Sequence, residues 1–523
     1  MFVLQKILHR FSRWLALALA AALVLGLAGC GDASNSFTWF VEEIPSNLDP
    51  QVASAPADVI ACKNLYGGLL RLGPDGQLQN DLCESWSVSA DGLRYTFTLR
   101  DGLTYTAAKG EPTEYAITAE DFVYAFQRVF LPETRSPYAA EFSALENAAA
   151  ILAGQMDVSA LGVSAPDERT VVFTLSQPDD GFLHKLTLPG AMPCDEEFFL
   201  GTRGTYGLTA SSTLSSGSFY LYNWTSSGLF LWRAADGTRI DSLRLVQNTG
   251  AAGQSAEELI LNERCSAALD DTAAPTALRS VSYSDTTWCL VFNCEALDSA
   301  LLRQALSAAA LDADYQPDSA LYTAAQGLVP DGLTVDGLDY REQAGNAMPS
   351  LGDAAGLYRA ALAADPALDL AGVTILLPTG SGLISTAEQI NSFWQKELSL
   401  FFSVEEAEAA DFAQRLAEGD YTIALVPVTA ESNSVYGLLS QFSPEGLTRY
   451  DNPHFAALLD QSLNATGAAR CALLAQAEAQ LVDDCALLPL FAQQKRLLIA
   501  DGVEGLVFDP YGPLLDLTYT TRE

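Results

Sequence analysis

The chain has 523 residues, and 28 lysines and arginines stand against 65 aspartates and glutamates, which gives a formal net charge of −37. Such a negative chain repels nucleic acid phosphates and anionic lipid head groups, so nucleic acid is excluded as a partner and anionic lipid is a poor one. Apolar residues make up 49% of the sequence, which supports large hydrophobic cores and excludes a mostly disordered protein. The length allows two or three lobes.

The N-terminus has the parts of a bacterial export signal. Three basic residues and no acidic residue flank the start of the apolar run Trp14–Leu27, and small residues follow it. The run is too short for a comfortable membrane span, which needs about 20 apolar residues. The segment Leu27–Cys30 looks like a bacterial lipobox, in which the cysteine receives lipid and becomes the new N-terminus. We therefore expect a signal peptide over residues 1–29 and lipidation of Cys30, with an uncleaved anchor helix as the alternative.

A short tether follows the predicted anchor. Residues 31–36 are small and polar, which is typical of a flexible connection. More than one acyl chain on Cys30 would make membrane anchoring stable, since each buried methylene contributes about 0.8 kcal/mol. The chain that remains after cleavage carries 25 basic and 65 acidic residues, a net charge of −40.

Cysteine and histidine usage argues against a transition-metal site. Eight cysteines remain besides Cys30, and none shows CxxC spacing. Many have apolar neighbours, as Cys289 has, which favours buried free thiols over disulfides. His184 and His454 stand alone in the mature chain, so neither a metal nor a cofactor is expected.

The predicted elements of the N-terminal half are two strands and one helix. Polar and apolar residues alternate over Leu93–Arg100, after an Asp-Gly turn, which predicts a strand with one solvated face. Thr118–Asp121 resembles a capping box. The helix that it opens carries a stripe that we interpret as core: Phe122, Ala125, Phe126 and Val129. A loop over Ala165–Asp167 is expected to precede a second strand over Val171–Leu175.

The C-terminal half is expected to contain two further helices and a buried strand. One helix presents a second core stripe made of Ile390, Phe393, Trp394 and Leu398. The other helix spans Cys471–Val482 and ends before a buried strand at Leu487–Leu490. Helix-like and strand-like segments alternate irregularly along the chain, which predicts a mixed α and β protein.

The sequence offers no positive evidence for an enzyme. It contains no GxSxG elbow, Walker loop or HExxH motif, and Gly380–Gly382 is a lone glycine-rich turn. Acidic pairs such as Asp270-Asp271 and Asp483-Asp484 are common on solvated faces and do not imply a glycosidase.

The order of many short motifs resembles extracellular solute-binding protein family 5, the oligopeptide- and dipeptide-binding proteins of ABC importers. The resemblance covers nearly all of the mature chain. The matching segments are, in order, Asn47–Pro50, Asn64–Leu69, Glu84–Ser89 with the strand after it, Thr118–Tyr124, Ser136–Ala139, Gly217–Tyr220 with Trp224, Phe292-Asn293 with Arg303, Tyr450–Phe455 and Leu487–Leu490.

The resemblance implies a fold and a division of the chain. The fold is an α/β periplasmic-binding-protein-like fold with two lobes (type II, cluster C-like) and an extra α+β domain, with the ligand bound between the lobes. The expected division is a signal peptide at 1–29, the tether at 30–36, lobe I at 37–80, 186–285 and 489–523, the extra domain at 81–185, and lobe II at 286–488.

The resemblance also implies candidate ligand-binding residues. In peptide-binding members the segment after "LDP" lies along the peptide backbone, which here corresponds to Ser54, Ala55 and Pro56. Pro56 has no N–H and so removes one main-chain hydrogen bond. Tyr138 matches a cleft tyrosine, with plain packing as the alternative. The family's ammonium-binding aspartate is absent. Glu431 is the nearest acid, with a solvated surface glutamate as the alternative.

The resemblance implies capture of peptides, or of a related small solute, outside the cytoplasmic membrane. The expected partners are that solute, the permease subunits of an ABC importer, and the membrane through lipid on Cys30. The alternative function is a peptide sensor or envelope chaperone that uses the same cleft without transport.

Overall fold

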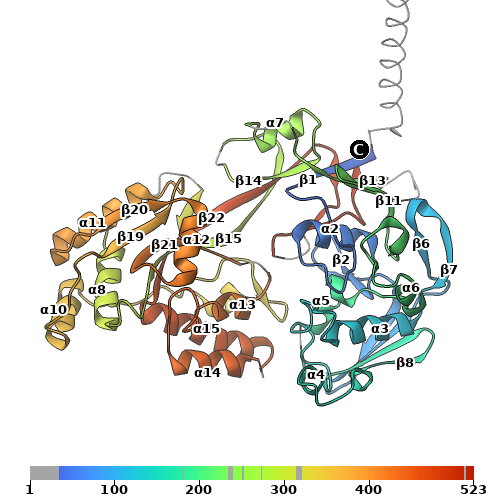
Figure 1. Ribbon diagram of the computed structural model, residues 1–523, viewed down its shortest axis with the longest axis horizontal. Coiled ribbons are helices and arrows are strands. Elements are labelled where there is room, and N and C mark those ends of the chain that lie inside the picture. The colour runs from blue at the N-terminus through green and yellow to red at the C-terminus, as the bar shows by residue number, and fades with distance from the viewer. Residues whose placement is uncertain are drawn as a thin grey trace, which may run out of the picture.

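The computed structural model describes residues 35–179, 181–233, 239–249, 253–272, 274–313, 321–430, 432–463, 465–511 and 514–522. The predicted signal peptide with Cys30 and the predicted site residue Glu431 lie outside these residues. No helix within the described ranges is long and apolar enough to cross a membrane. The chain forms two lobes of mixed α and β structure, which lie at the left and right of Figure 1.

The right-hand lobe in Figure 1, lobe I, contains a four-stranded sheet in the order β1-β13-β12-β11. Ser36–Val41 (β1) pairs in parallel with Ser242–Gln247 (β13), whereas Gly228–Trp232 (β12) and Tyr220–Thr225 (β11) join antiparallel. Burial alternates along β1 because successive side chains of a strand point to opposite faces. The buried face packs into one core with helix α2 (Pro56–Leu65).

A second sheet and helix α3 (Ala119–Phe130) lie below this sheet in Figure 1. The sheet order is β4 (Cys83–Val88), β5 (Arg94–Leu99), β9 (Thr170–Thr174) and β8 (Val163–Asp167). The strands predicted near residues 93–100 and 171–175 are confirmed. The predicted core stripe of α3 is buried, and the Thr118 N–H donates a hydrogen bond to the Asp121 carboxylate at 3.1 Å, as a capping box requires.

The loop predicted at Ala165–Asp167 is wrong, because these residues form the second half of β8. β8 is an edge strand, and an edge strand tolerates Pro166 although proline donates no ladder hydrogen bond. The turn therefore lies after Asp167, whose backbone pairs with Thr170.

The other elements of this half and of the chain's C-terminal end are short. They are β2 (Leu70–Leu72), β3 (Leu78–Asn80), β6 (Thr104–Ala107), β7 (Pro112–Ala116), α4 (Ala148–Leu152), α5 (Phe182–Lys185), α6 (Glu196–Gly201), β10 (Leu214–Ser215), α7 (Ala256–Leu261), β23 (Val503–Glu504), β24 (Val507–Asp509), β25 (Leu514–Asp516) and β26 (Thr521–Arg522).

Lobe II is built on a seven-stranded sheet whose main path is β14-β22-β15-β21-β19-β20. The strands are β14 (Ala267–Asp270), β15 (Arg279–Phe292), β16 (Tyr322–Ala324), β19 (Thr374–Pro378), β20 (Ser403–Ala407), β21 (Ile423–Thr429) and β22 (Leu487–Ile499). A small hairpin, β17 (Thr334–Val335) and β18 (Leu338–Asp339), packs beside the sheet.

Helices cover both faces of the lobe II sheet and form two cores (Figure 1). One core includes α8 (Ala300–Leu311), α10 (Ala354–Ala364) and α11 (Ile384–Leu398). The other includes α9 (Tyr340–Ala344), α12 (Ala409–Glu418), α13 (Val435–Ser440), α14 (Pro453–Ser462) and α15 (Gly467–Asp483). The two predicted C-terminal helices and the buried strand after them are confirmed. Within the predicted stripe only Phe393 is half-buried, under the Lys396 ammonium.

Two long strands, β15 and β22, join the lobes. The residues Leu487–Phe491 of β22 pack in the lobe II cores, whereas Leu497–Ile499 pack in the lobe I core. β15 runs antiparallel to β22, and its register shifts between Tyr283 and Thr286. The predicted junctions at 285/286 and 488/489 fall inside these strands, and the proposed division of the chain stays a prediction.

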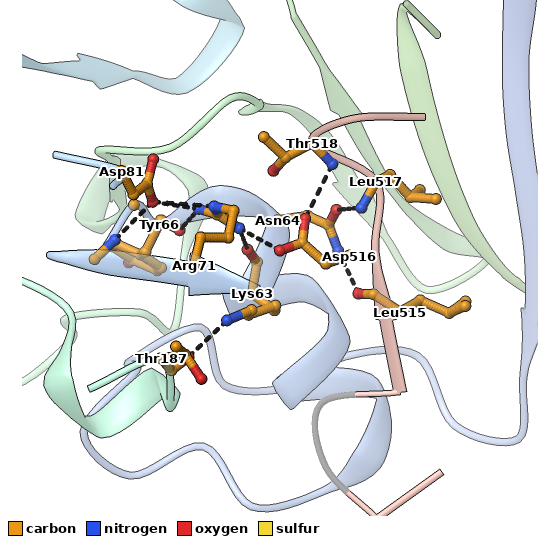
Figure 2. Close-up of polar contacts among 12 residues, drawn as sticks. Lys63, Asn64, Tyr66, Arg71, Asp81, Thr187, Leu515, Asp516, Leu517 and Thr518 are labelled. Atoms are coloured by element: carbon orange, nitrogen blue, oxygen red, sulfur yellow. Dashed lines mark hydrogen bonds and ion pairs between the residues drawn. The ribbon is translucent and has the colours of Figure 1, made fainter. Parts of the chain in front are cut away.

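A buried polar network ties the C-terminal segment to α2 (Figure 2). The Arg71 guanidinium donates hydrogen bonds to Asp516 at 2.6 Å, to Asp81 at 3.0 Å and to two main-chain carbonyls. Lys63 donates to the Thr187 carbonyl at 2.6 Å, and burial followed by the nearby Arg71 charge lowers the pKa of Lys63 to about 8. This network fixes the shape of lobe I around α2.

The cysteines of the described residues are free thiols, and all except Cys294 are buried. The prediction of buried free thiols is therefore confirmed for seven of the eight cysteines after Cys30, and Cys294 is free but only half-buried.

Candidate functional site

The predicted ligand segment Ser54–Pro56 lies exposed where α2 begins. Ala55 is extended, with φ −66° and ψ 139°, and Pro56 takes the first helical position, where its missing N–H costs nothing. Among the described residues the N–H groups of Ser54 and Ala55 have no backbone partner. The segment therefore presents main-chain donors and acceptors that a bound chain can pair with.

A buried arginine on α3 holds the residues just before this segment. The Arg128 guanidinium contacts the Asp49 carboxylate at 2.5 and 3.1 Å and donates to the Gln51 side-chain oxygen at 2.6 Å. It also stacks on the Phe199 ring, 4.0 Å from the ring centre. Gln51 in turn donates to the Met192 carbonyl at 2.9 Å. Arg128 is 4% exposed and Asp49 is 6% exposed, so this pair is shielded from water.

Tyr138 contacts the segment from the other side. Its hydroxyl donates to the Ala53 carbonyl at 2.6 Å, and Ser136 donates to the Gln51 carbonyl at 2.6 Å. The ring packs so closely on Gly190 that a Cβ there would lie 2.5 Å from the ring. Burial raises the pKa of Tyr138 well above its ordinary value, so its hydroxyl stays protonated. The structure therefore places Tyr138 as a support for the segment, with its donor already engaged.

The lobe II side of the candidate site follows β21. Glu431 itself is outside the described residues, but its neighbours are fixed on both sides. The Ala430 N–H donates to the Asp285 carbonyl at 2.8 Å, and the Asn433 N–H donates to the Tyr511 carbonyl at 2.9 Å. The Asn433 side chain also bonds Thr334 in both directions, at 2.8 and 2.9 Å. Ala430 is thus bound to the crossing strand β15, and Asn433 to the C-terminal segment.

An acid that the sequence analysis missed lies beside this position. Asp285 falls where the β15 register shifts, and its carboxylate pairs with the Lys495 ammonium at 2.6 Å and accepts the Thr286 hydroxyl at 2.7 Å. No sequence signal could identify Asp285, because an exposed surface acid has the same local pattern. Arg128 did carry a signal, since a charged residue beside an apolar helical stripe suggests a buried ion pair.

The two lobes also touch away from the crossing strands. The Gln177 side chain donates to the Leu463 carbonyl at 3.1 Å. Gly181 approaches the β17–β18 turn so closely that a Cβ on it would lie 3.1 Å from the Asp336 carboxylate. Gln177 and Gly181 on the lobe I side therefore contact lobe II at Leu463 and at the β17–β18 turn.

Two surface cavities lie outside the predicted ligand segment. One, of about 470 Å³, is lined by Arg303, Tyr450 and Asp484 among others, and the second, of about 480 Å³, lies between Pro45 and Trp224. Neither includes residues 54–56. Within the described ranges no three acidic, histidine or cysteine side chains are grouped to hold a metal ion.

Comparison with known proteins assigns the arrangement to a family. The family model "Bacterial extracellular solute-binding proteins, family 5 Middle" matches residues 77–447. The chain belongs to this family. Its members are solute-binding proteins, so this family 5 chain is a binding protein and not an enzyme.

Solved structures show the same two-lobe fold, which confirms the predicted fold class. The pheromone receptor PrgZ matches with a TM-score of 0.69 and 22% identity over 94% of this chain and 100% of its own. Listeria monocytogenes OppA bound to peptide matches with a TM-score of 0.68 and 20% identity over 94% of this chain and 99% of its own.

Curated relatives are similar over different lengths. The oligopeptide-binding protein OppA of Bacillus subtilis is 22% identical over 96% of this chain and 98% of its own length. The probable deoxycholate-binding periplasmic protein YgiS of Escherichia coli is 36% identical, but over 34% of this chain and 33% of its own length. The oligopeptide-binding protein SarA of Streptococcus gordonii is 29% identical over 52% of this chain and 44% of its own. The chain thus spans less than half of the last two relatives.

Proposed function

We propose that this family 5 protein captures peptides between its two lobes and delivers them to an ABC importer. The observation that carries the proposal is the exposed, extended segment Ser54–Pro56. Arg128 and Tyr138 hold the residues just before it in place through hydrogen bonds to Gln51 and Ala53. A rigid stretch of main chain with free N–H groups can pair with an extended peptide in the manner of an added strand. Rigidity favours this binding because the segment loses little conformational freedom on pairing.

The free ammonium of a peptide needs a carboxylate, since an unpaired buried charge costs several kcal/mol. Glu431 remains our candidate, and the hydrogen bonds of Ala430 to Asp285 on the crossing strand β15 and of Asn433 to Tyr511 support it. Asp285 is the second candidate, because it lies next to this loop and Lys495 already neutralises it. A ligand ammonium could replace Lys495 as the partner of Asp285.

We further propose that Cys30 carries lipid and holds the protein on the outer face of the cytoplasmic membrane. The lipobox-like segment Leu27–Cys30 after an export signal supports this anchor. A tethered binding protein stays near a membrane-embedded permease, which raises its effective concentration there.

Binding of free and N-acetylated peptides by calorimetry tests the ligand. We expect the free peptide to bind and Glu431→Gln to weaken it by roughly tenfold to a few hundredfold, the worth of a charged hydrogen bond. Glu406→Gln, at an exposed position of β20 in the same lobe, serves as the matched control and should bind like the parent. Asp285→Asn tests the second carboxylate. Equal binding of free and acetylated peptides would contradict an ammonium site on either residue.

The match to YgiS favours a second candidate ligand. Because that relative is named as probably deoxycholate-binding, a steroid carboxylate is the non-peptide solute to test. Mass spectrometry of ligand that co-purifies with the protein distinguishes the two. A bile acid in place of peptides would contradict the peptide assignment and leave the solute-binding role intact.

A further inference from the structure

The outer face of the β1-β13-β12-β11 sheet has an unusual composition for this chain. The residues that point into the core from these strands are apolar and at most 8% exposed: Phe37, Trp39, Val41, Leu221, Leu229, Leu231, Leu243 and Leu245. Alternation then places the residues between them on the opposite face. Apart from Phe40, which packs against the core, those are Ser36, Thr38, Tyr220, Tyr222, Asn223, Phe230, Trp232, Ser242, Arg244 and Val246. We call this set the outer sheet face.

The outer sheet face is aromatic and carries no acid, although acids outnumber basic residues 65 to 28 in the whole sequence. Its one charge is Arg244, whose guanidinium lies over the Phe230 ring, 5.7 Å from the ring centre. Tyr222 and Trp232 stack in parallel at 3.6 Å, and Tyr222 is 38% exposed. A β-bulge between Leu221 and Asn223 brings Tyr222 onto this face.

The register places this aromatic pair near the first residue of β1. Tyr220 pairs with Trp232, Trp232 with Ser242, and Ser242 with Ser36, so these residues form one row across four strands. Neighbouring strands are about 4.8 Å apart, so Trp232 lies about 10 Å from Ser36. β1 and its neighbours lie together at the upper right of Figure 1.

The tether is too short to let this face move far from an anchor. Six residue steps separate Cys30 from Ser36, and a fully extended chain covers at most about 20 Å in that length. A short tether also gives an effective concentration of about 1 mM, so that even a weak contact is populated.

We propose that the outer sheet face is a membrane-contacting surface that lies against the lipid head groups when Cys30 is acylated. Tryptophan and tyrosine are the side chains that favour the bilayer interface, because each has an apolar body and a polar tip. The lack of acids matters equally, since most of the surface of this acidic chain would be repelled by anionic lipid. Arg244 adds the charge that anionic head groups attract. The proposal rests on the proposed lipid anchor and is independent of which solute is bound.

Contact of this kind would also orient the protein. With one face of lobe I against the membrane, lobe II would be connected to that fixed lobe through the crossing strands β15 and β22. Hinge motion could then move lobe II while lobe I stays in place.

Fluorescence quenching on vesicles tests the proposal. The full acylated chain is reconstituted into vesicles of mixed zwitterionic and anionic phospholipid, with a nitroxide quencher on the head group of a fraction of the lipid. We expect tryptophan quenching that is mostly lost in Trp232→Phe and retained in Trp86→Phe. Trp86 is the matched control, because it is 39% exposed on β4 of the other sheet. Arg244→Glu should lower the quenching of Trp232 and leave peptide affinity unchanged.

The outcomes separate this proposal from the others. Flotation with vesicles reports the anchor, and peptide binding reports the ligand. If the chain floats but Trp232→Phe is quenched like the parent, the membrane-contacting face is overturned and the anchor stands. If quenching follows Trp86 instead, a different face contacts the lipid. If the chain does not float, the lipid anchor is overturned, and the proposal that the outer sheet face contacts the membrane is overturned with it. A folding defect in Trp232→Phe would appear as lost peptide binding, and Tyr222→Gln then replaces it, with reduced Trp232 quenching expected.

Discussion

Arg128→Met isolates the ion pair that holds the ligand segment. Methionine keeps the apolar part of the side chain, so the change removes the charge and the hydrogen bonds to Asp49 and Gln51 with little change in packed volume. Because Asp49 is 6% exposed, its carboxylate would stay buried without a cationic partner, with only the Gln51 N–H still donating to it at 3.1 Å. Breaking one side of a buried pair in this way costs about 3–5 kcal/mol of unfolding free energy.

Urea unfolding followed by circular dichroism measures this loss, and calorimetry measures peptide binding in the folded variant. Arg94→Met, at an exposed position of β5, is the control and should change the unfolding free energy by at most about 0.5 kcal/mol. Peptide affinity should also fall, by roughly tenfold for each 1.4 kcal/mol of binding free energy that is spent on ordering the loosened segment Ser54–Pro56. Combining Arg128→Met with Asp49→Asn should cost less than the two single changes added together. An Arg128→Met protein as stable as Arg94→Met would refute the reasoning.

Three further outcomes follow from the structure. Burial alone would raise the pKa of Asp516, but the Arg71 and Lys63 charges outweigh burial and hold this pKa below its ordinary value. The ionised Asp516 therefore stabilises the fold above about pH 4, and this stability is lost as the pH falls further. Acid unfolding of Asp516→Asn should depend less on pH than that of the parent protein. Tyr138→Phe removes the hydrogen bond to the Ala53 carbonyl and should cost about 0.5–1.5 kcal/mol by urea unfolding. Small-angle scattering should show a smaller radius of gyration with ligand than without it. Gly181→Val should reduce that change, because the valine side chain obstructs the contact between the lobes. An unchanged radius of gyration in the parent protein would contradict closure of the lobes.

Short-range patterns were sufficient for many elements. The capping box at Thr118, the alternation over residues 93–100 and the helix over Cys471–Val482 depend on neighbours two to four residues away, and the structure confirms them. The wrong loop at Ala165–Asp167 shows the limit, because a proline is tolerated only if its strand lies at the sheet edge. Edge position depends on which strands pair, and pairing is a long-range property.

The candidate site divides in the same way. The order of motifs identified the family, and it predicted the segment Ser54–Pro56 as a ligand site. It did not show that the Tyr138 hydroxyl donates its hydrogen bond to the Ala53 carbonyl, nor that Arg128 pairs with Asp49, which lies 79 residues earlier in the chain. Asp285 became a candidate only because a shifted strand register sets it beside Lys495, which is 210 residues away in sequence.

The sequence by itself determined the chain's acidity, its α/β class and its place among solute-binding proteins, because composition and local motifs encode each of these. The export signal stays a prediction from the same kind of pattern. Tertiary structure alone decided which surfaces those residues form. The row from Ser36 to Tyr220 brings together strands that are up to 206 residues apart, and only their register reveals an acid-free aromatic face that reaches β1. Hydrogen bonding between distant strands sets that register, and no local pattern along one strand contains it.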